Sequence, residues 1–287
     1  MFEMFQLQFI TQAFIVAVLT GLLLSYLGVH VVGRGIVFVD LALGQISSLG
    51  VAFSDYVGYG HTTIPLVFTL VGAFLLSFIN IKDRRLKQEA IIGIVYGAAS
   101  ALTVLLISKT PHGDSNIQEV LFGNILAVSW DQIEIIAIVF GIVGLVHIIF
   151  QKKFFELTER FESGENAKVG LFNLWNFLFY LSIGLSIVFA VRVGGVIPVF
   201  SYLIIPSVSA VMLGRTNRSV VPIALTTSIL GGFLGLNFAY HFDFPAGSSI
   251  VAVLAAIFCL VSAVRILKVP PLKNKERNVE NRGNIGS

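Results

Sequence analysis

Long apolar runs separated by short polar or charged segments dominate the chain. Nine of these runs come close to the length of about 20 residues that a helix needs to cross a bilayer. They lie at roughly 9–29, 36–53, 63–81, 90–108, 131–150, 172–191, 196–213, 219–240 and 248–267. The pattern therefore predicts an all-α, polytopic integral membrane protein with about nine transmembrane helices. Eight is the alternative count, because the second run carries the charged residue Asp40.

The composition agrees with this class of protein. The 287 residues are 56% hydrophobic and 12% charged, with a mean hydropathy of +0.89, whereas soluble domains have about 25% charged residues. The single cysteine, Cys259, excludes an internal disulfide and a multi-cysteine metal site. The sequence contains no Gly-x-x-x-x-Gly-Lys phosphate loop and no hydrolytic motif, so we do not expect an enzyme.

Basic residues cluster at 82–87, 152–168, 215–218 and 268–282. Placing all of them in the cytoplasm, as the positive-inside rule requires, puts the amino terminus outside and the carboxyl terminus inside. The amino-terminal segment lacks the basic stretch of a cleavable signal, so we expect the first span to be retained. Residues 269–287 are polar and charged, which predicts a disordered cytoplasmic tail after a transmembrane domain of residues 1–268.

The second run contains the main candidate for chemistry. Asp40, Gly44 and Ser47 are spaced i, i+4, i+7 and share one helical face, with Gln45 and Ser48 on the adjacent stripe. A carboxylate at membrane depth costs about 2.5–3.5 kcal/mol on insertion scales, so it must face a partner, a bundle interior or water. The stripe is therefore either a polar packing seam between helices or the lining of a transport path.

Three further candidates lie near the ends of other runs. Glu89 opens the fourth run, where an acid can either stabilise the helix amino terminus or serve a function. His241 and Asp243 lie between the last two runs on the outer side, where an imidazole and a carboxylate can both face a cation. Most such pairs in loops bind nothing, so this interpretation competes with that of a plain turn.

Taken in order, these motifs resemble the permease subunits of bacterial ABC importers for zinc, manganese and iron. The resemblance rests on five blocks in the family's order, which are Arg34 with Asp40–Gln45, Arg84–Ile94, Leu121–Leu126, Val193–Pro206 and Asp243–Ile250. If the chain transports a metal in this way, we expect Asp40 to be the first path residue, followed by Asp243 and His241 at the outer mouth and Glu89 last, with Gln45 as a further candidate ligand. Gln45 stands where the family has a histidine, and Asp40 is one residue further from that position than the family's aspartate. These departures leave the metal open among the three.

The resemblance implies a multi-pass permease of the bacterial inner membrane that works by alternating access and carries no cofactor of its own. Its partners would be a second copy of itself, cytosolic ATPase subunits that bind ATP, an extracytoplasmic metal-binding protein and membrane lipid, with no nucleic acid. The ATPase would dock on Phe155–Gly170, an amphipathic segment with Ala167 and Gly170 in its closing A-x-x-G.

Two alternatives to an ATP-driven permease remain open. An ion-coupled secondary transporter of a small cation would use Asp40 to carry the coupling proton, and its uptake would collapse with the proton gradient. A membrane scaffold would transport nothing. A gene for an ATPase and one for a binding protein beside this gene would argue against both.

The loop charges predict the topology directly. A reporter that is active only in the cytoplasm, fused after Ser287, should be active because the carboxyl terminus is predicted inside. The same reporter fused within the 54–62 loop should be inactive. The reverse pattern in reporter activity would contradict the charge-based topology.

Overall fold

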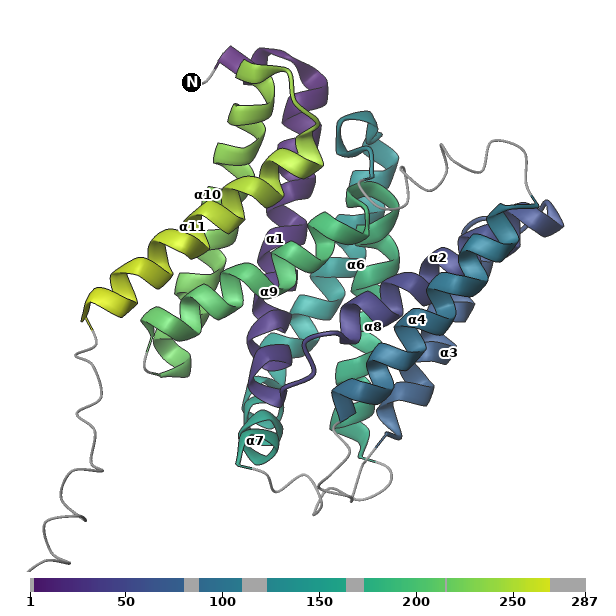
Figure 1. Cartoon of the computed structure of the whole chain (residues 1–287), viewed down its shortest axis with the longest axis horizontal. Helices are drawn as coiled ribbons and strands as arrows, with labels where there is room; N and C mark the ends of the chain where they lie inside the picture. The colour runs from purple at the N-terminus through teal and green to yellow at the C-terminus, as the bar shows by residue number, and fades with distance from the viewer. Residues whose placement is uncertain (1–2, 80–87, 110–122, 164–172, 215, 269–287) are drawn as a thin grey trace, which may run out of the picture.

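The structure is a computed structural model that describes residues 3–79, 88–109, 123–163, 173–214 and 216–268. Every regular element in these residues is helical (Figure 1). Nine long helices correspond to the nine predicted spans, and they are α1 (Gln8–Arg34), α2 (Val39–Val57), α3 (Thr63–Ser77), α4 (Gln88–Ile107), α6 (Trp130–Ile149), α8 (Leu174–Gly194), α9 (Val196–Leu213), α10 (Asn217–Phe242) and α11 (Ala246–Lys268). Shorter elements are η1 (Glu3–Gln6), η2 (Ile125–Ala127) and α7 (Gln151–Glu162).

The predicted membrane class is confirmed. Seven of the described helices are both long and apolar enough to cross a bilayer. The other two are α3, which has 15 residues, and α2, which carries the polar stripe. Membrane helices can include polar residues where these face protein or a water-filled cavity. In α2, the polar stripe is buried against neighbouring helices.

The first helix extends further than its apolar run, to Arg34 instead of residue 29. His30 and Arg34 ended the apolar pattern in the sequence, but both side chains are buried and hydrogen-bonded to other helices. The helix stops at Gly35, whose φ of 65° is the left-handed conformation that glycine adopts most easily. Tertiary partners, which a sequence pattern does not reveal, therefore decide where α1 ends.

The helices form two groups that meet along α1, α8 and α9 (Figure 1). One group contains α1, α9, α10 and α11, and the other contains α2, α3, α4 and α8. Helices α6 and α7 pack on α1 and α8. The amino terminus and the α10–α11 turn lie at the top of the view, and α7 lies at the bottom. In the predicted topology, the bottom is the cytoplasmic side.

Helix α7 confirms that the segment after α6 is amphipathic. It buries Phe154, Leu157 and Thr158 and exposes most of its charged side chains. The rest of the predicted docking segment, including Ala167 and Gly170, lies outside the described residues, as does the predicted tail at 269–287. Both remain predictions.

Helices α1 and α9 approach each other closely at Gly28. A Cβ atom at this position would overlap the backbone carbonyl oxygen of Leu203 and crowd the hydroxyl of Ser207. The Ser207 hydroxyl lies within hydrogen-bond distance of both the Leu203 and the Ser25 carbonyl oxygens, at 2.7 and 2.9 Å. Small residues at such contacts let membrane helices pack backbone to backbone.

Gly28→Ala should therefore destabilise the folded protein, because the new methyl group forces α1 and α9 apart. Overpacking of this kind typically costs about 1–3 kcal/mol. Thermal unfolding of the detergent-solubilised protein measures the effect as a lowered melting temperature. Gly97→Ala is the matched control, since a Cβ at Gly97 on α4 meets nothing within 4 Å. Equal melting temperatures for the two variants would contradict the close approach.

Candidate functional site

The polar stripe of α2 faces the protein interior. Asp40, Gln45, Ser47 and Ser48 are all buried. Gly44 lies on the same face as Asp40, and a Cβ at that position would lie 3.6 Å from Val196 on α9 and 3.9 Å from Ile187 on α8. The predicted shared face is therefore turned toward the α8–α9 junction, where the two groups of helices meet.

Asp40 is buried without a side-chain partner. Only 3% of its surface is exposed, and no side chain in the part of the chain that the structure describes bonds to its carboxylate oxygens, whose nearest donors are the backbone N–H groups of Asp40 and Leu41. Among the Asp, Glu, Lys and Arg side chains of the described residues, only Asp40 and Arg34 are buried. No ion pair joins these two residues, because Arg34 bonds to Thr158 and Asn176.

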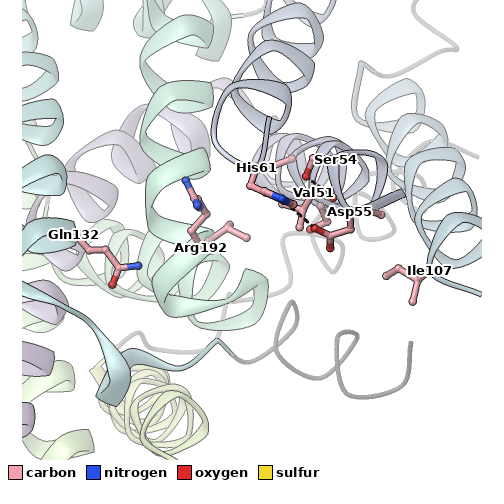
Figure 2. A pocket seen from close by; sticks show the side chains of 11 residues that line it. Val51, Ser54, Asp55, His61, Ile107, Gln132 and Arg192 are labelled. Carbon is pink, nitrogen blue, oxygen red and sulfur yellow. Dashed lines mark hydrogen bonds and ion pairs between the residues drawn. The ribbon is translucent and has the colours of Figure 1, made fainter. Parts of the chain in front are cut away.

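At its outer end the stripe opens into a pocket of about 370 Å³ (Figure 2). Six residues of α2 line one wall, and they are Ser47, Ser48, Val51, Ala52, Ser54 and Asp55. His61, Ile107, Gln132, Val191 and Arg192 complete the lining from the α2–α3 turn and from α4, α6 and α8. The pocket thus joins the interior serines of α2 to the predicted outer surface.

Beyond the two serines of the polar stripe, the sequence pattern did not predict the polar side chains that line this pocket. His61 Nδ1 lies 3.2 Å from Asp55 Oδ1, and both side chains are partly exposed to solvent. On the other side, Arg192 donates to Thr62 Oγ1 at 3.1 Å, and Gln132 accepts from the Ser129 backbone in a capping box. The only sequence signal for the first pair was a carboxylate and an imidazole flanking the two turn glycines, Gly58 and Gly60.

The other predicted site residues lie elsewhere. His241 lies in the last turn of α10, and Asp243 caps this helix with a φ of 55°. Both are exposed, and neither lines the pocket. The left-handed conformation of Asp243 gives it a structural role in the α10–α11 turn. The predicted metal role of this pair stays a prediction.

Glu89 is half-buried in the first turn of α4. Gly93 and Tyr96, spaced i+4 and i+7 from Glu89 on the same helical face, are exposed, and a Cβ at Gly93 meets nothing within 4 Å. This face therefore points outward from the protomer, while the neighbouring Gln88 donates to the Tyr180 hydroxyl at 2.7 Å. Among the described residues, no three His, Cys, Asp or Glu side chains gather in a group that could hold a metal ion.

The pocket beside α2 predicts a labelling pattern. In a Cys259→Ala background, Val51→Cys should react with a membrane-impermeant maleimide added outside the cell, because Val51 lines the pocket. Leu49→Cys is the matched control, since Leu49 is half-buried like Val51 but does not line the pocket. The mass shift of the purified protein measures labelling. Reaction at both positions or at neither would contradict a pocket open to the outside.

Comparison with known proteins places the chain in a family. Residues 6–265 match the sequence profile described as the ABC 3 transport family. The chain is 29% identical to the manganese transport system membrane protein MntC of Listeria monocytogenes over 257 residues, covering 88% of this chain and 89% of that protein. It is 26% identical to the chelated iron transport system membrane protein YfeD of Yersinia pestis, covering 96% and 91%.

The fold agrees with a solved relative. The structure titled PsaBC from Streptococcus pneumoniae in complex with Fab superposes with a TM-score of 0.74 at 27% identity. The match covers 89% of this chain and 91% of the other. A profile match over nearly the whole described region and a shared fold lead to one conclusion: this chain belongs to the ABC 3 transport family.

Proposed function

We propose that the protein is the membrane permease of an ABC importer that carries manganese or iron across the membrane along the polar face of α2. The observation that carries the proposal is the buried carboxylate of Asp40, which has no side-chain partner among the described residues and lies on a face that reaches an outer pocket. Family membership and relatives named for manganese and iron transport support the substrate class. They favour an ATP-driven permease over an ion-coupled secondary transporter or a scaffold.

The ligand chemistry of α2 favours manganese over zinc. Asp40 and Gln45 offer a carboxylate and an amide oxygen, and Ser47 and Ser48 offer hydroxyls. Hard oxygen ligands suit Mn²⁺, whereas zinc sites in proteins are built mostly from imidazole and thiolate. Glutamine at position 45 replaces the imidazole that the family resemblance led us to expect. We therefore rank manganese first, iron second and zinc third.

The outer pocket supplies an entry for the cation. Asp55 and His61 present one carboxylate and one imidazole at its rim. A volume of about 370 Å³ leaves space for an ion that still holds water molecules. A metal-binding protein outside would deliver the ion, and Ser47, Ser48, Gln45 and Asp40 would then meet it in turn.

The path is completed by partners. We propose that two copies of the chain enclose it and that an ATPase subunit docks beside α7. A cytoplasmic-side pocket of about 290 Å³ lies between α1, α7 and the α9–α10 turn, and Glu159 and Glu162 contribute to its lining. These carboxylates suit a basic segment of the partner. ATP binding and hydrolysis there would rock the two copies between outward-open and inward-open states.

Asp40→Asn tests the path. The change keeps the size of the side chain and removes the charge that would meet the cation. We expect uptake of radiolabelled manganese to fall at least about ten-fold, with an unchanged amount of assembled permease, because a charged ligand interacts far more strongly with a cation than a neutral one does. Asp131→Asn, an exposed acid in the first turn of α6, is the control and should retain uptake.

The packing-seam alternative makes the opposite prediction. If Asp40 only packs helices together, Asp40→Asn would give either normal uptake or a loss of protein that matches the loss of uptake. Normal manganese uptake by Asp40→Asn at a normal level of expression would contradict the proposed path.

A further inference from the structure

Thr158 on α7 is a meeting point for two basic side chains of α1. His30 Nδ1 lies 2.9 Å from Thr158 Oγ1, and Arg34 Nε donates to the same oxygen at 3.2 Å. The hydroxyl also donates to the Phe154 carbonyl of its own helix at 2.9 Å. His30 is fully buried, and Arg34 and Thr158 are each 6% exposed.

These contacts use the whole capacity of one hydroxyl group. A threonine hydroxyl has one hydrogen to donate and two lone pairs to accept with. With the hydrogen directed to Phe154, the two lone pairs are left to accept from Arg34 Nε and from the tautomer of His30 that carries its hydrogen on Nδ1. Loss of this one hydroxyl would therefore leave two buried donors on α1 without their acceptor.

Arg34 extends the connection to two more helices. Its Nη1 donates to Asn176 Oδ1 on α8 at 3.1 Å, and Asn176 Nδ2 donates to the Ser77 carbonyl of α3 at 3.1 Å. The guanidinium carbon lies 3.6 Å from the centroid of the Phe179 ring, within cation–π distance. No acid among the described residues forms an ion pair with Arg34. Hydrogen bonds from Nε and Nη1 and an aromatic face hold the charge instead, while the buried Nη2 has no hydrogen-bond partner among the described residues.

A short connection joins Arg34 to Asp40. Only residues 35–38 separate α1 from α2. Backbone hydrogen bonds from Gly35 to Val32, from Ile36 to Val31 and from Val39 to Ile36 tie this connection to the helices on both sides. Ile36 and Val39 are also buried. A shift at the end of α1 must therefore move the first turn of α2, where Asp40 lies.

We infer that Arg34 is a positioning residue that links α7 to Asp40, so that a displacement of α7 by the ATPase moves the carboxylate that meets the cation. The inference rests on the proposed function, which places the ATPase beside α7. If α7 moved alone, the buried donors of His30 and Arg34 would lose their acceptor, which is unfavourable in a dry interior. The end of α1 therefore follows α7, and α2 follows α1.

Thr158→Val tests the link, because valine keeps the shape of threonine and removes the hydroxyl. In proteoliposomes with the complete transporter and its binding protein, we expect the number of Mn²⁺ ions imported per ATP hydrolysed to fall at least five-fold. Thr103→Val on α4 is the matched control. Thr103 is 5% exposed, and its hydroxyl bonds to the Ala99 carbonyl of its own helix, so the import ratio should stay at the wild-type value.

Two more variants separate coupling from folding. Thr158→Ser keeps the hydroxyl and should restore the ratio. Gly33→Ala keeps Thr158 but should lower the ratio, because a Cβ at Gly33 would lie 2.7 Å from Thr158 Cγ2 and push α7 away from α1. The melting temperature and yield of each purified complex are measured in parallel, since a loss of folding would lower both.

The outcomes distinguish this inference from the proposed function. A wild-type complex that imports no manganese or iron would refute the proposed function. Import by the wild type, together with a wild-type ratio in Thr158→Val and Gly33→Ala, would overturn the role of Arg34 alone. If Thr158→Val yields no complex, an unchanged ratio in Gly33→Ala overturns the inference and a lowered ratio supports it.

Discussion

The free energy of placing a charge away from water limits where charged side chains can lie in a membrane protein. In the described part of this chain, two such side chains are buried, and they meet the limit in different ways. Arg34 is surrounded by a hydroxyl, an amide and an aromatic face. Asp40 has no side-chain partner among the described residues, and its nearest donors are backbone N–H groups of its own first turn. Packing alone does not explain why a carboxylate is buried at this position, because an apolar residue would pack there at lower free energy.

The packing of the neighbouring helices fixes the position of the Asp40 carboxylate. Gly44 on α2 faces Val196 of α9 and Ile187 of α8 at ordinary van der Waals distance, and Gly28 lets α9 approach the backbone of α1. The α8–α9 junction thus lies against both α1 and α2. Because the four-residue connection from Arg34 to α2 is itself hydrogen-bonded, Asp40 is held by α1 as well as by its own helix. Its position is fixed by backbone packing more than by side-chain contacts.

The sequence predicted the helices well, because a span needs about 20 apolar residues and few other structures satisfy the backbone in a bilayer. Positions 196–213 agree with α9 to the residue. The pattern was misleading at the end of α1, where buried polar partners extend the helix to Arg34. It also could not find Asp55 and His61, since their meeting depends on the conformation of the α2–α3 turn. Conversely, His241 and Asp243 are close in sequence, yet both are exposed and neither lines the pocket.

The oxygen ligands of the proposed path suit a transporter that binds its cargo weakly. A permease must release its cargo, so it gains nothing from a complete coordination shell of its own. In the proposed path, a few oxygen ligands from α2 would lower the barrier for a cation that keeps part of its water. A full site of soft ligands would hold a transition metal too tightly to pass. Because Gln45 replaces a histidine, the proposed path would bind a transition metal more weakly and would suit a hard ion that is bound loosely. In the proposed path, selectivity among metals would then come mainly from the protein that delivers the ion, while Asp40 would supply the charge that draws it inward.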